Sequence, residues 1–401
     1  MRIESMTVTP VAMPDPPLRN SVGVHQPVAL RIVVELTDEA GRVGLGEAPG
    51  GSRRLAALEA AVRDVVGQDP HHLGALRERV PDPRVFSAIE VACLDLAAQA
   101  AGVPVVDLLG GPVRDRVPFS AYLFFKNAAH QGAEPDRWGE VLTPEAMVEE
   151  ARTFVDRYGF RALKVKGGVL DPHQEARTMA LLREAFPDRP LRLDPNALWS
   201  VETSLQVARA VEPLELEWLE DPARGMDEMA QVRASTRVPL STNMCVTAFE
   251  DLPQAVALRP VDVILADHHF WGGLRETVRL SAFCRDFGFG VGMHSNSHYG
   301  ISLAAMVHVG AAMPHLTADC DTHYPWLEED IVQGEPFHFE DGALRVPAAP
   351  GLGVTLDRDR LKAAAERYRR MGITDRDDRA GMPGAPPDAP DPYADLSRPR
   401  P

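Results

Sequence analysis

Polar residues close six successive apolar runs in the middle of the chain, and the spacing between them is nearly constant. In order, these residues are Lys166, Asp194, Glu220, Asn243, Asp267 and His294. The steps between them are 28, 26, 23, 24 and 27 residues, and each step is long enough for one strand and one helix. A single carboxylate after a strand is commonly a turn former or a helix cap, and a single histidine is commonly structural. The regular repeat instead predicts one shared site.

The stretch FRALKVKGGVL sets Lys164 and Lys166 two residues apart in a run that otherwise reads as a buried strand. Residues i and i+2 of a strand point to the same face, so the two ammonium groups project together. Each is then expected to lower the pKa of the other. An edge strand with a solvated face is the structural alternative. A lysine tuned to act as a base is the chemical interpretation.

Asp194, Glu220 and Asn243 would supply three oxygen ligands from adjacent strands. Because no cysteine or histidine stands among them, the set suits a hard divalent ion, and Mg²⁺ is expected. A substrate carboxylate bound to that ion becomes neutralised. The proton on its α-carbon is then easier to remove, and the ion stabilises the enediolate that forms.

Bases are expected on both sides of such a carbon acid. Lys166 precedes the three ligands, and Lys164 beside it would tune its pKa. Asp267 and His294 follow the ligands on neighbouring strands. An aspartate hydrogen-bonded to an imidazole fixes the tautomer and raises the basicity of the ring.

The bulk composition excludes several classes of protein. The 401 residues are 45% hydrophobic and 25% charged, which is typical of a globular chain with a large core. The formal net charge of −16 argues against nucleic-acid binding. The four cysteines are far apart and the start of the chain lacks a secretory signal, so we expect a reduced, cytoplasmic protein. The run 301–318 contains His308 and Pro314 and suits a buried helix better than a membrane span.

The elements that must position these residues change character along the chain. Residues 1–115 begin with alternating strands and continue with helical periodicity, which predicts an α+β capping domain. Residues 116–346 alternate short apolar strands with amphipathic segments eight times, which predicts a (β/α)8 barrel of the TIM type. A doubly wound open sheet is the second choice, but no glycine-rich dinucleotide turn follows these strands. Active sites of such barrels lie at the carboxyl ends of the strands.

Residues 347–401 form a C-terminal segment. It holds a helix closed by Gly372 and then a stretch crowded with proline and aspartate. Composition alone predicts that this last stretch is a disordered tail.

Several motifs together resemble the enolase superfamily and, within it, the glucarate dehydratase subgroup. They are FRALKVKGGVL, LRLDPNALWS, EWLEDP, STNM, ILADHHFWGG, MHSNSHYGISLA and DTHYPW, with LRNSVGVHQP near the start and RDDRAGM near the end. The resemblance covers nearly the whole chain. It implies a capping domain completed by the C-terminal segment, a Mg²⁺-dependent barrel, and dehydration of an aldaric acid such as D-glucarate to 5-keto-4-deoxyglucarate. The chain departs from the subgroup at His268, Ser297 and Gly300, where proline, asparagine and aspartate are more usual.

The resemblance also implies roles for single residues. Asp194, Glu220 and Asn243 would hold Mg²⁺, Lys166 would be one base, and His294 with Asp267 the other. Lys164 would touch the substrate carboxylate, and Asn196 would lie near the substrate. The remaining substrate contacts would be Asn20, His25, Ser87, Tyr122, Ser295, Asn296, His323 and Arg376. An arginine that grips the distal carboxylate requires an ordered tail, so the resemblance reverses the compositional prediction for the segment around Arg376.

Three functional hypotheses follow. The first is a lyase acting on a small aldarate in acid-sugar catabolism, in a homo-oligomer that contacts neither nucleic acid nor membrane. The second is another activity that shares the enediolate step, such as dehydration of idarate, galactarate or a monoacid sugar, or an epimerisation. The third is a non-catalytic sugar-acid-binding relative, which predicts loss of at least one base or ligand. All of these residues are present.

Overall fold

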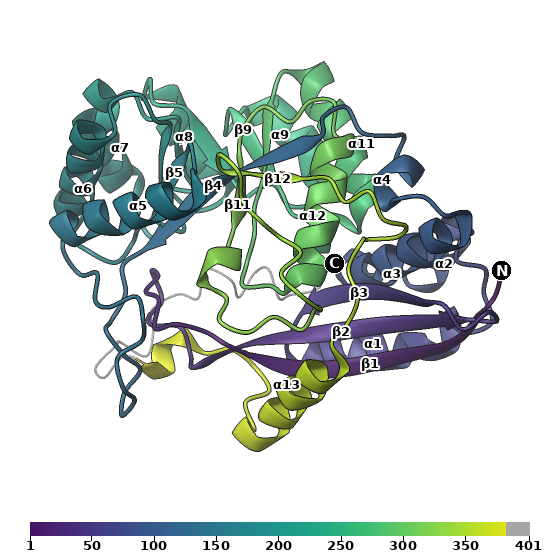
Figure 1. Ribbon diagram of the computed structural model, residues 1–401. Helices are drawn as coiled ribbons and strands as arrows, with labels where there is room; N and C mark the ends of the chain where they lie inside the picture. Colours follow the sequence, from purple (N-terminus) through teal and green to yellow (C-terminus); the bar gives the residue numbers. More distant parts are fainter. Residues whose placement is uncertain (382–401) are drawn as a thin grey trace.

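The computed structural model describes residues 1–381, and its N-terminal part is a three-stranded antiparallel sheet with helices on one face (Figure 1). The strands are β1 (Ile3–Pro14), β2 (Val28–Asp38) and β3 (Val43–Pro49). The helices are α1 (Ser52–Val65), α2 (Leu73–Arg79), α3 (Pro83–Ala101) and α4 (Val105–Leu108). Asp38 makes the β2–β3 turn, because its side chain accepts hydrogen bonds from the backbone N–H groups of Ala40 and Arg42.

Eight parallel strands form the second part, a nearly closed barrel in the neighbour order β10-β9-β8-β7-β6-β5-β4-β11. They are β4 (Arg116–Phe124), β5 (Leu163–Lys166), β6 (Leu191–Asp194), β7 (Trp218–Glu220), β8 (Leu240–Thr242), β9 (Val263–Ala266), β10 (Gly290–Met293) and β11 (Cys320–Thr322). Thr317, just before β11, joins the two end strands, since its N–H donates to the Val291 carbonyl at 2.9 Å. A short strand β12 (Ala343–Arg345) pairs antiparallel with β4.

Helices surround the barrel strands. They are α5 (Pro144–Tyr158), α6 (Pro172–Ala185), α7 (Val201–Val211), α8 (Gly225–Ala234), α9 (Leu252–Leu258), α10 (His268–Trp271), α11 (Leu274–Phe287) and α12 (Gly300–Ala312). Local sequence sets their starts, because Thr143 and Asp171 cap α5 and α6 and each is followed by proline. Short 3₁₀ turns η1 (Glu212–Leu214), η2 (Phe249–Asp251) and η3 (Tyr324–Trp326) complete the connections.

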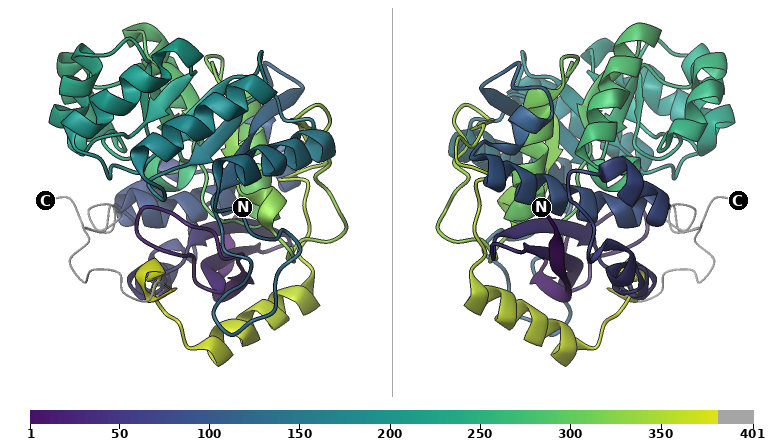
Figure 2. Two further views of the ribbon diagram at one scale, coloured as in Figure 1. Left: turned by 90° about the vertical axis from the view of Figure 1, so that its left-hand side faces the viewer. Right: turned by 90° about the vertical axis from the view of Figure 1, so that its right-hand side faces the viewer.

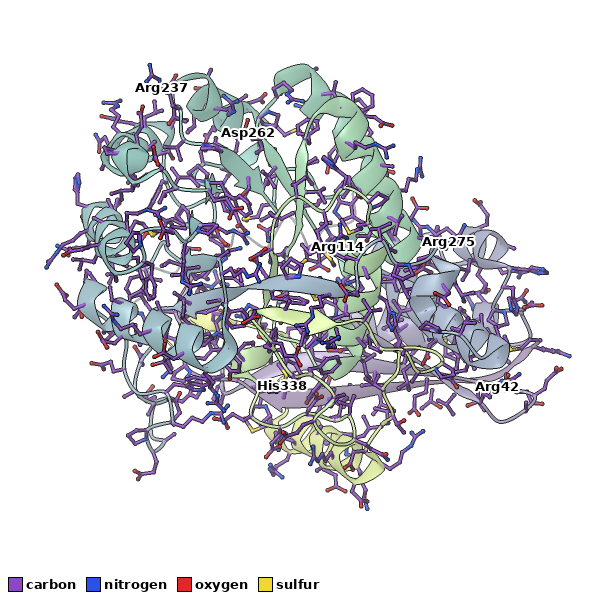
Figure 3. All side chains as sticks on the ribbon, turned by 45° about the horizontal axis from the view of Figure 1, so that its top comes forward. Arg42, Arg114, Arg237, Asp262, Arg275 and His338 are labelled. Carbon is purple, nitrogen blue, oxygen red and sulfur yellow. The ribbon has the colours of Figure 1, made fainter. Side chains whose placement is uncertain are left out.

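A buried carboxylate joins the capping domain to the barrel. Glu90 of α3 accepts from the backbone N–H groups of Leu274 and Arg275 at 2.7 and 3.1 Å, which caps the start of α11. Figure 3 shows Arg275 where the cap helices meet the barrel. Burial raises the pKa of Glu90 to about 7, although the two backbone hydrogen bonds oppose that rise.

The C-terminal segment returns to the capping domain, where α13 (Arg358–Met371) lies along the sheet on the side away from the barrel (Figures 1 and 2). Tyr368 and Ile373 pack there on a small apolar cluster of Ala12, Val28 and Leu30, apart from the main core. The chain then reaches the loop 20–24 and ends its description in the turn η4 (Asp378–Gly381).

The predicted fold class is confirmed: a capping domain completed by the C-terminal segment, and a (β/α)8 barrel with all eight predicted strands. The exact domain boundaries stay predictions, and residues 382–401 of the predicted C-terminal segment lie outside the described residues. Within residues 1–381, no helix is both long and apolar enough to cross a bilayer. The cytoplasmic location and the homo-oligomer also stay predictions.

Candidate active site at the barrel mouth

The register of the barrel brings the predicted strand-end residues together. Lys166 is paired with Asp194 across β5 and β6, and Tyr122 is paired with Lys164 across β4 and β5. Glu220 ends β7, and Asn243 follows β8 directly. All of these side chains are buried, so their charges interact through protein rather than bulk water.

Lys164 lies at the centre of an acidic cluster. Its Nζ is 2.6 Å from Glu220 Oε1, 2.7 Å from Asp321 Oδ2 and 3.4 Å from Asp194 Oδ2. Burial by itself would lower the pKa of Lys164, but the carboxylates of Asp321 and Glu220 outweigh it and hold that pKa well above its ordinary value. The neighbouring lysine therefore does not set the direction in which the pKa of Lys164 is shifted. The two carboxylates therefore favour the ammonium form of Lys164.

Lys166 points at the next pair of oxygens. Its Nζ donates to Asp194 Oδ2 at 2.7 Å and to Asn196 Oδ1 at 2.5 Å. Asn196 holds a positive φ of 61°, and its N–H donates back to Asp194 Oδ1 at 3.0 Å. Such a backbone conformation is uncommon outside glycine, although asparagine tolerates it best. The strained turn aims the Asn196 amide at Lys166, next to the place where Asp194 ends its strand.

Three oxygen-bearing side chains fit the predicted divalent ion. Asp194 and Glu220 are fully buried, and Asn243 is 2% exposed. In the described part of the chain, no group donates to Asn243 Oδ1, although that oxygen is buried. Asp221 fixes Asn243 from behind, since it accepts from the Asn243 N–H at 2.8 Å. Two carboxylates and an amide oxygen left without a donor are the ligands that Mg²⁺ prefers.

The predicted dyad forms on the other side of these ligands. Asp267 Oδ2 accepts from His294 Nδ1 at 3.0 Å, which leaves His294 Nε2 as the acceptor and thus as the basic nitrogen. The ring of Phe270 stacks on His294 with centroids 6.1 Å apart. Burial would raise the pKa of Asp267, but His269 and His294 hold it well below its usual range.

A chain of buried groups behind the dyad was not predicted from the sequence. Asp267 Oδ1 accepts from His269 Nδ1 at 2.8 Å. His269 Nε2 lies 3.1 Å from Ser302 Oγ and 3.3 Å from Arg31 Nη2, and Arg31 Nε donates to Glu47 Oε1 at 2.6 Å. The acid of the dyad is thus tied to strands β2 and β3 of the capping sheet. Asp267, His268 and His269 also offer clustered metal-ligand atoms, but both Asp267 oxygens already accept from imidazoles.

Aromatic rings close one wall of the site. The rings of Tyr122 and His323 are 4.7 Å apart, and His25 stacks on His323 at 6.5 Å. Lys164 Nζ lies over the Tyr122 ring at 4.5 Å, a cation–π contact. Ser295 Oγ accepts from the His323 N–H at 3.1 Å. The predicted contacts Tyr122, His25, Ser295 and His323 therefore lie together beside the lysines.

The predicted contacts of the cap and tail form a second group. Asn20 Nδ2 donates to Asp378 Oδ2 at 2.8 Å, and Arg376 donates to both Asp378 oxygens, through Nε at 2.7 Å and Nη2 at 2.6 Å. Asn296 is half-buried on the barrel side of the same region. Ser87 is fully buried in α3, where its hydroxyl donates to the Arg84 carbonyl.

The sequence did contain a signal for one missed residue. Asp321 follows His294 by 27 residues, the same step that separates His294 from Asp267, and it lies in β11. Asp321 Oδ1, the oxygen that Lys164 does not contact, accepts from Arg192 Nη1 at 3.4 Å and from Ser120 Oγ at 3.0 Å. The regular spacing of strand-end residues, extended by one more step to the eighth strand, therefore indicates Asp321.

Comparison with known proteins places this architecture. Residues 2–110 match the model described as the mandelate racemase/muconate lactonizing enzyme N-terminal domain, and residues 146–360 match that of the enolase C-terminal domain-like family. The chain belongs to this family of enzymes in the enolase superfamily, as the sequence resemblance indicated.

Two curated relatives and one crystal structure are similar to this chain over most of its length. A "probable glucarate dehydratase" of Streptomyces coelicolor is 46% identical over 97% of this chain and 97% of its own length. A D-xylonate dehydratase of Haloferax volcanii is 28% identical over 83% of this chain and 84% of its own. A crystal structure of an enolase from Pseudomonas fluorescens Pf0-1, with bound magnesium, potassium and tartrate, is 44% identical, superposes with a TM-score of 0.94 and covers 98% of this chain and 99% of its own.

Proposed function

We propose that the protein is a dehydratase of acid sugars, a lyase whose substrate is an aldaric acid such as D-glucarate and whose product is 5-keto-4-deoxyglucarate. The 46% identity to a probable glucarate dehydratase over nearly the whole chain supports this reaction. The observation that best supports this function is the order of the strands. The three buried oxygen ligands come from β6, β7 and β8, while Lys166 lies on β5 to one side of them and the Asp267–His294 dyad follows β9 and β10 on the other side.

Asp194, Glu220 and Asn243 would hold a divalent ion such as Mg²⁺. When bound, that ion would neutralise a substrate carboxylate and lower the free energy of forming the negatively charged enediolate. The Pseudomonas fluorescens relative binds magnesium, which supports this choice. Lys164 remains protonated beside Glu220, so it acts as a fixed positive charge for the substrate carboxylate and not as a base.

Lys166 or His294 removes the proton α to the carboxylate, according to which face of the carbon bears it. The β-hydroxyl then departs as the carbon–oxygen bond breaks. Where His294 has taken the α-proton, its Nε2 carries that proton and can deliver it to the departing oxygen; where Lys166 has taken it, His294 must enter the step already protonated at Nε2. In both cases Asp267 stabilises the imidazolium. Loss of water leaves an enol, which tautomerises to the keto acid.

The testing experiment uses purified protein with Mg²⁺ and a panel of D-glucarate, L-idarate, galactarate and the matching monoacid sugars, assayed for α-keto acid. We expect turnover of at least one diacid that EDTA abolishes. Absence of turnover on every member of the panel would contradict the proposal.

One observation favours a second candidate, a dehydratase of monoacid sugars. Arg376, the predicted ligand of the distal carboxylate, already donates two hydrogen bonds to Asp378. A substrate carboxylate would have to share that guanidinium. The D-xylonate dehydratase relative acts on a monoacid. Activity on monoacids with none on diacids would support this candidate.

A further inference from the structure

Asp267, the acid of the dyad, accepts hydrogen bonds on both of its oxygens. Oδ2 accepts from His294 Nδ1 at 3.0 Å, while Oδ1 accepts from the backbone N–H of His269 at 2.9 Å and from its ring Nδ1 at 2.8 Å. The backbone contact makes Asp267 the cap of α10, so it holds the carboxylate whatever side chain stands at position 269. The ring of His269 is therefore not needed to orient Asp267, and it adds a second donor to Oδ1.

Only one tautomer of the His269 ring fits its other neighbours. Nε2 lies 3.3 Å from Arg31 Nη2 and 3.1 Å from Ser302 Oγ. A guanidinium can only donate, and Arg31 Nη2 also donates to Ser302 Oγ at 3.3 Å, which leaves the serine hydroxyl hydrogen for His269. Nε2 therefore accepts, and the ring proton stands on Nδ1, where it faces Asp267.

The capping domain holds this arrangement in place. Arg31 lies on β2, and its Nε donates to Glu47 Oε1 of β3 at 2.6 Å. Glu47 also accepts from the backbone N–H groups of Tyr299 and Ser302 at 3.0 and 2.9 Å, at the start of α12. Burial would raise the pKa of Glu47, but the charge of Arg31 holds it below its usual value. A buried ion pair of the cap thus fixes both the arginine and the serine that face His269.

We propose that His269 is a positioning residue of the dyad, which acts on His294 through Asp267. Its Nδ1–H shares the negative charge of the carboxylate, so Asp267 stabilises the His294 imidazolium less than it would without this donor. A group that must both accept a proton and release one to a departing hydroxyl benefits from this limit. The proposal rests on the proposed function, since that function assigns His294 its proton transfers.

Other charged or titratable groups face the dyad and His269 from both domains: Arg31, Glu47 and Arg54 of the cap, and His268, His298 and His323 of the barrel. Burial keeps the three barrel histidines neutral near neutral pH, because it lowers the pKa of His298 to about 4 and that of the other two well below the usual range. The three cap groups keep their charges there. A change in the titration of His294 in a variant therefore reports the substituted side chain.

The test compares His269→Phe and His269→Asn with a matched control, His268→Phe. Phenylalanine keeps a ring beside His268 but removes both nitrogens, whereas the asparagine amide can still donate to Asp267 Oδ1. His269→Gln repeats the loss of that donor while its longer amide keeps an acceptor for Arg31 and Ser302, so it replaces His269→Phe if the latter does not fold. His268 is buried beside His269, with ring centroids 3.9 Å apart, and within residues 1–381 it donates to neither Asp267 oxygen.

The first readout is the titration of the His294 ring by NMR in histidine-labelled protein, with the signal identified by its loss in His294→Asn. We expect His269→Phe to raise the pH midpoint of this titration by about 0.5–1 unit, because Asp267 then faces the imidazolium with one donor fewer. His269→Asn and His268→Phe should match the wild type. A midpoint that stays or falls in His269→Phe would overturn the proposal, as would a wild-type spectrum in which His269 carries its proton on Nε2.

The second readout is exchange of the α-hydrogen of D-glucarate and L-idarate with D2O in the presence of Mg²⁺. In a Lys166→Ala background, where His294 is the remaining base, His269→Phe should move the acid limb of the exchange upward by the same amount, because His294 must be neutral to take the proton. In a His294→Asn background, where Lys166 is the remaining base, the same change should leave the exchange unaltered. Equal losses in both backgrounds would mean a purely structural role and would refute the inference.

The two readouts separate this inference from the proposed function. If the wild type neither exchanges nor dehydrates any acid sugar, but His269→Phe raises the His294 midpoint, the proposed function fails and the positioning role of His269 stands. If the wild type dehydrates an aldarate, and both readouts of His269→Phe equal those of the wild type, the proposed function stands and this inference fails.

Discussion

Replacing Lys164 by methionine should destabilise the protein strongly, because that ammonium compensates three buried carboxylates. Its Nζ lies 2.6, 2.7 and 3.4 Å from oxygens of Glu220, Asp321 and Asp194, and all four side chains are fully buried. Removing one partner of a buried ion pair costs about 3–5 kcal/mol. Methionine retains most of the side-chain volume, so the loss reports charge rather than packing.

The assay is urea unfolding at pH 7.5 with EDTA, followed by tryptophan fluorescence. The matched control is Lys126→Met, which removes another fully buried lysine whose carboxylate partner, Asp136 Oδ1, lies at 2.9 Å and is not one of the proposed ligands. Both variants should lose stability of similar size. Added Mg²⁺ should raise the free energy of unfolding of Lys164→Met more than that of Lys126→Met, because a cation beside Glu220 and Asp194 restores the missing charge.

Two results would refute this reasoning. A loss below about 1 kcal/mol for Lys164→Met would mean that the three carboxylates do not depend on the lysine for compensation. Equal stabilisation of both variants by Mg²⁺ would contradict a divalent ion held next to Lys164.

Three further predictions concern the bases, the metal ligands and acid stability. Lys166→Ala and His294→Ala should keep the wild-type circular dichroism spectrum but lose about 10²- to 10⁴-fold in turnover, and wild-type activity in either would remove its assigned role. Asn243→Leu should raise the Mg²⁺ concentration for half-maximal activity at least about tenfold, and an unchanged titration would exclude this ligand. Burial lowers the pKa of His308 to about 4, so the folded protein keeps this ring neutral and should lose stability as pH falls from about 6.5 to about 4. The thermal midpoint of His308→Gln should fall less than that of the wild type over this range. Parallel curves for the two proteins would contradict the assignment.

The barrel and most of its site were predictable because the relevant information is local and periodic. Each short apolar run ends in a polar residue, and parallel register then places those ends at one mouth. This rule alone predicts that Lys166, Asp194 and Glu220 lie close together. The dyad also followed from it, since Asp267 and His294 end neighbouring strands.

The rest depends on contacts that no local pattern records. Lys164 was interpreted from the lysine two residues away, but its pKa is set by Glu220 and Asp321, which are 56 and 157 residues away. His269 meets Arg31 across 238 residues, from cap to barrel. Arg376 and Asp378, which pair with each other, are close in sequence. Because their segment is rich in proline and aspartate, the sequence alone predicts that both side chains are exposed to solvent.

The cover that α13 lays on the capping sheet has a consequence for synthesis of the chain. Leu30 lies near the beginning, whereas Tyr368, which packs against its cluster, is made 338 residues later. At about 5–20 residues per second, roughly 20–70 s pass on the ribosome before that cover exists. A capping sheet that forms during this interval would have the apolar face of Ala12, Val28 and Leu30 open to solvent and to other nascent chains. Changes in α13 should therefore lower the yield of protein in cells, through aggregation during translation, more than they lower the activity of the molecules that complete folding.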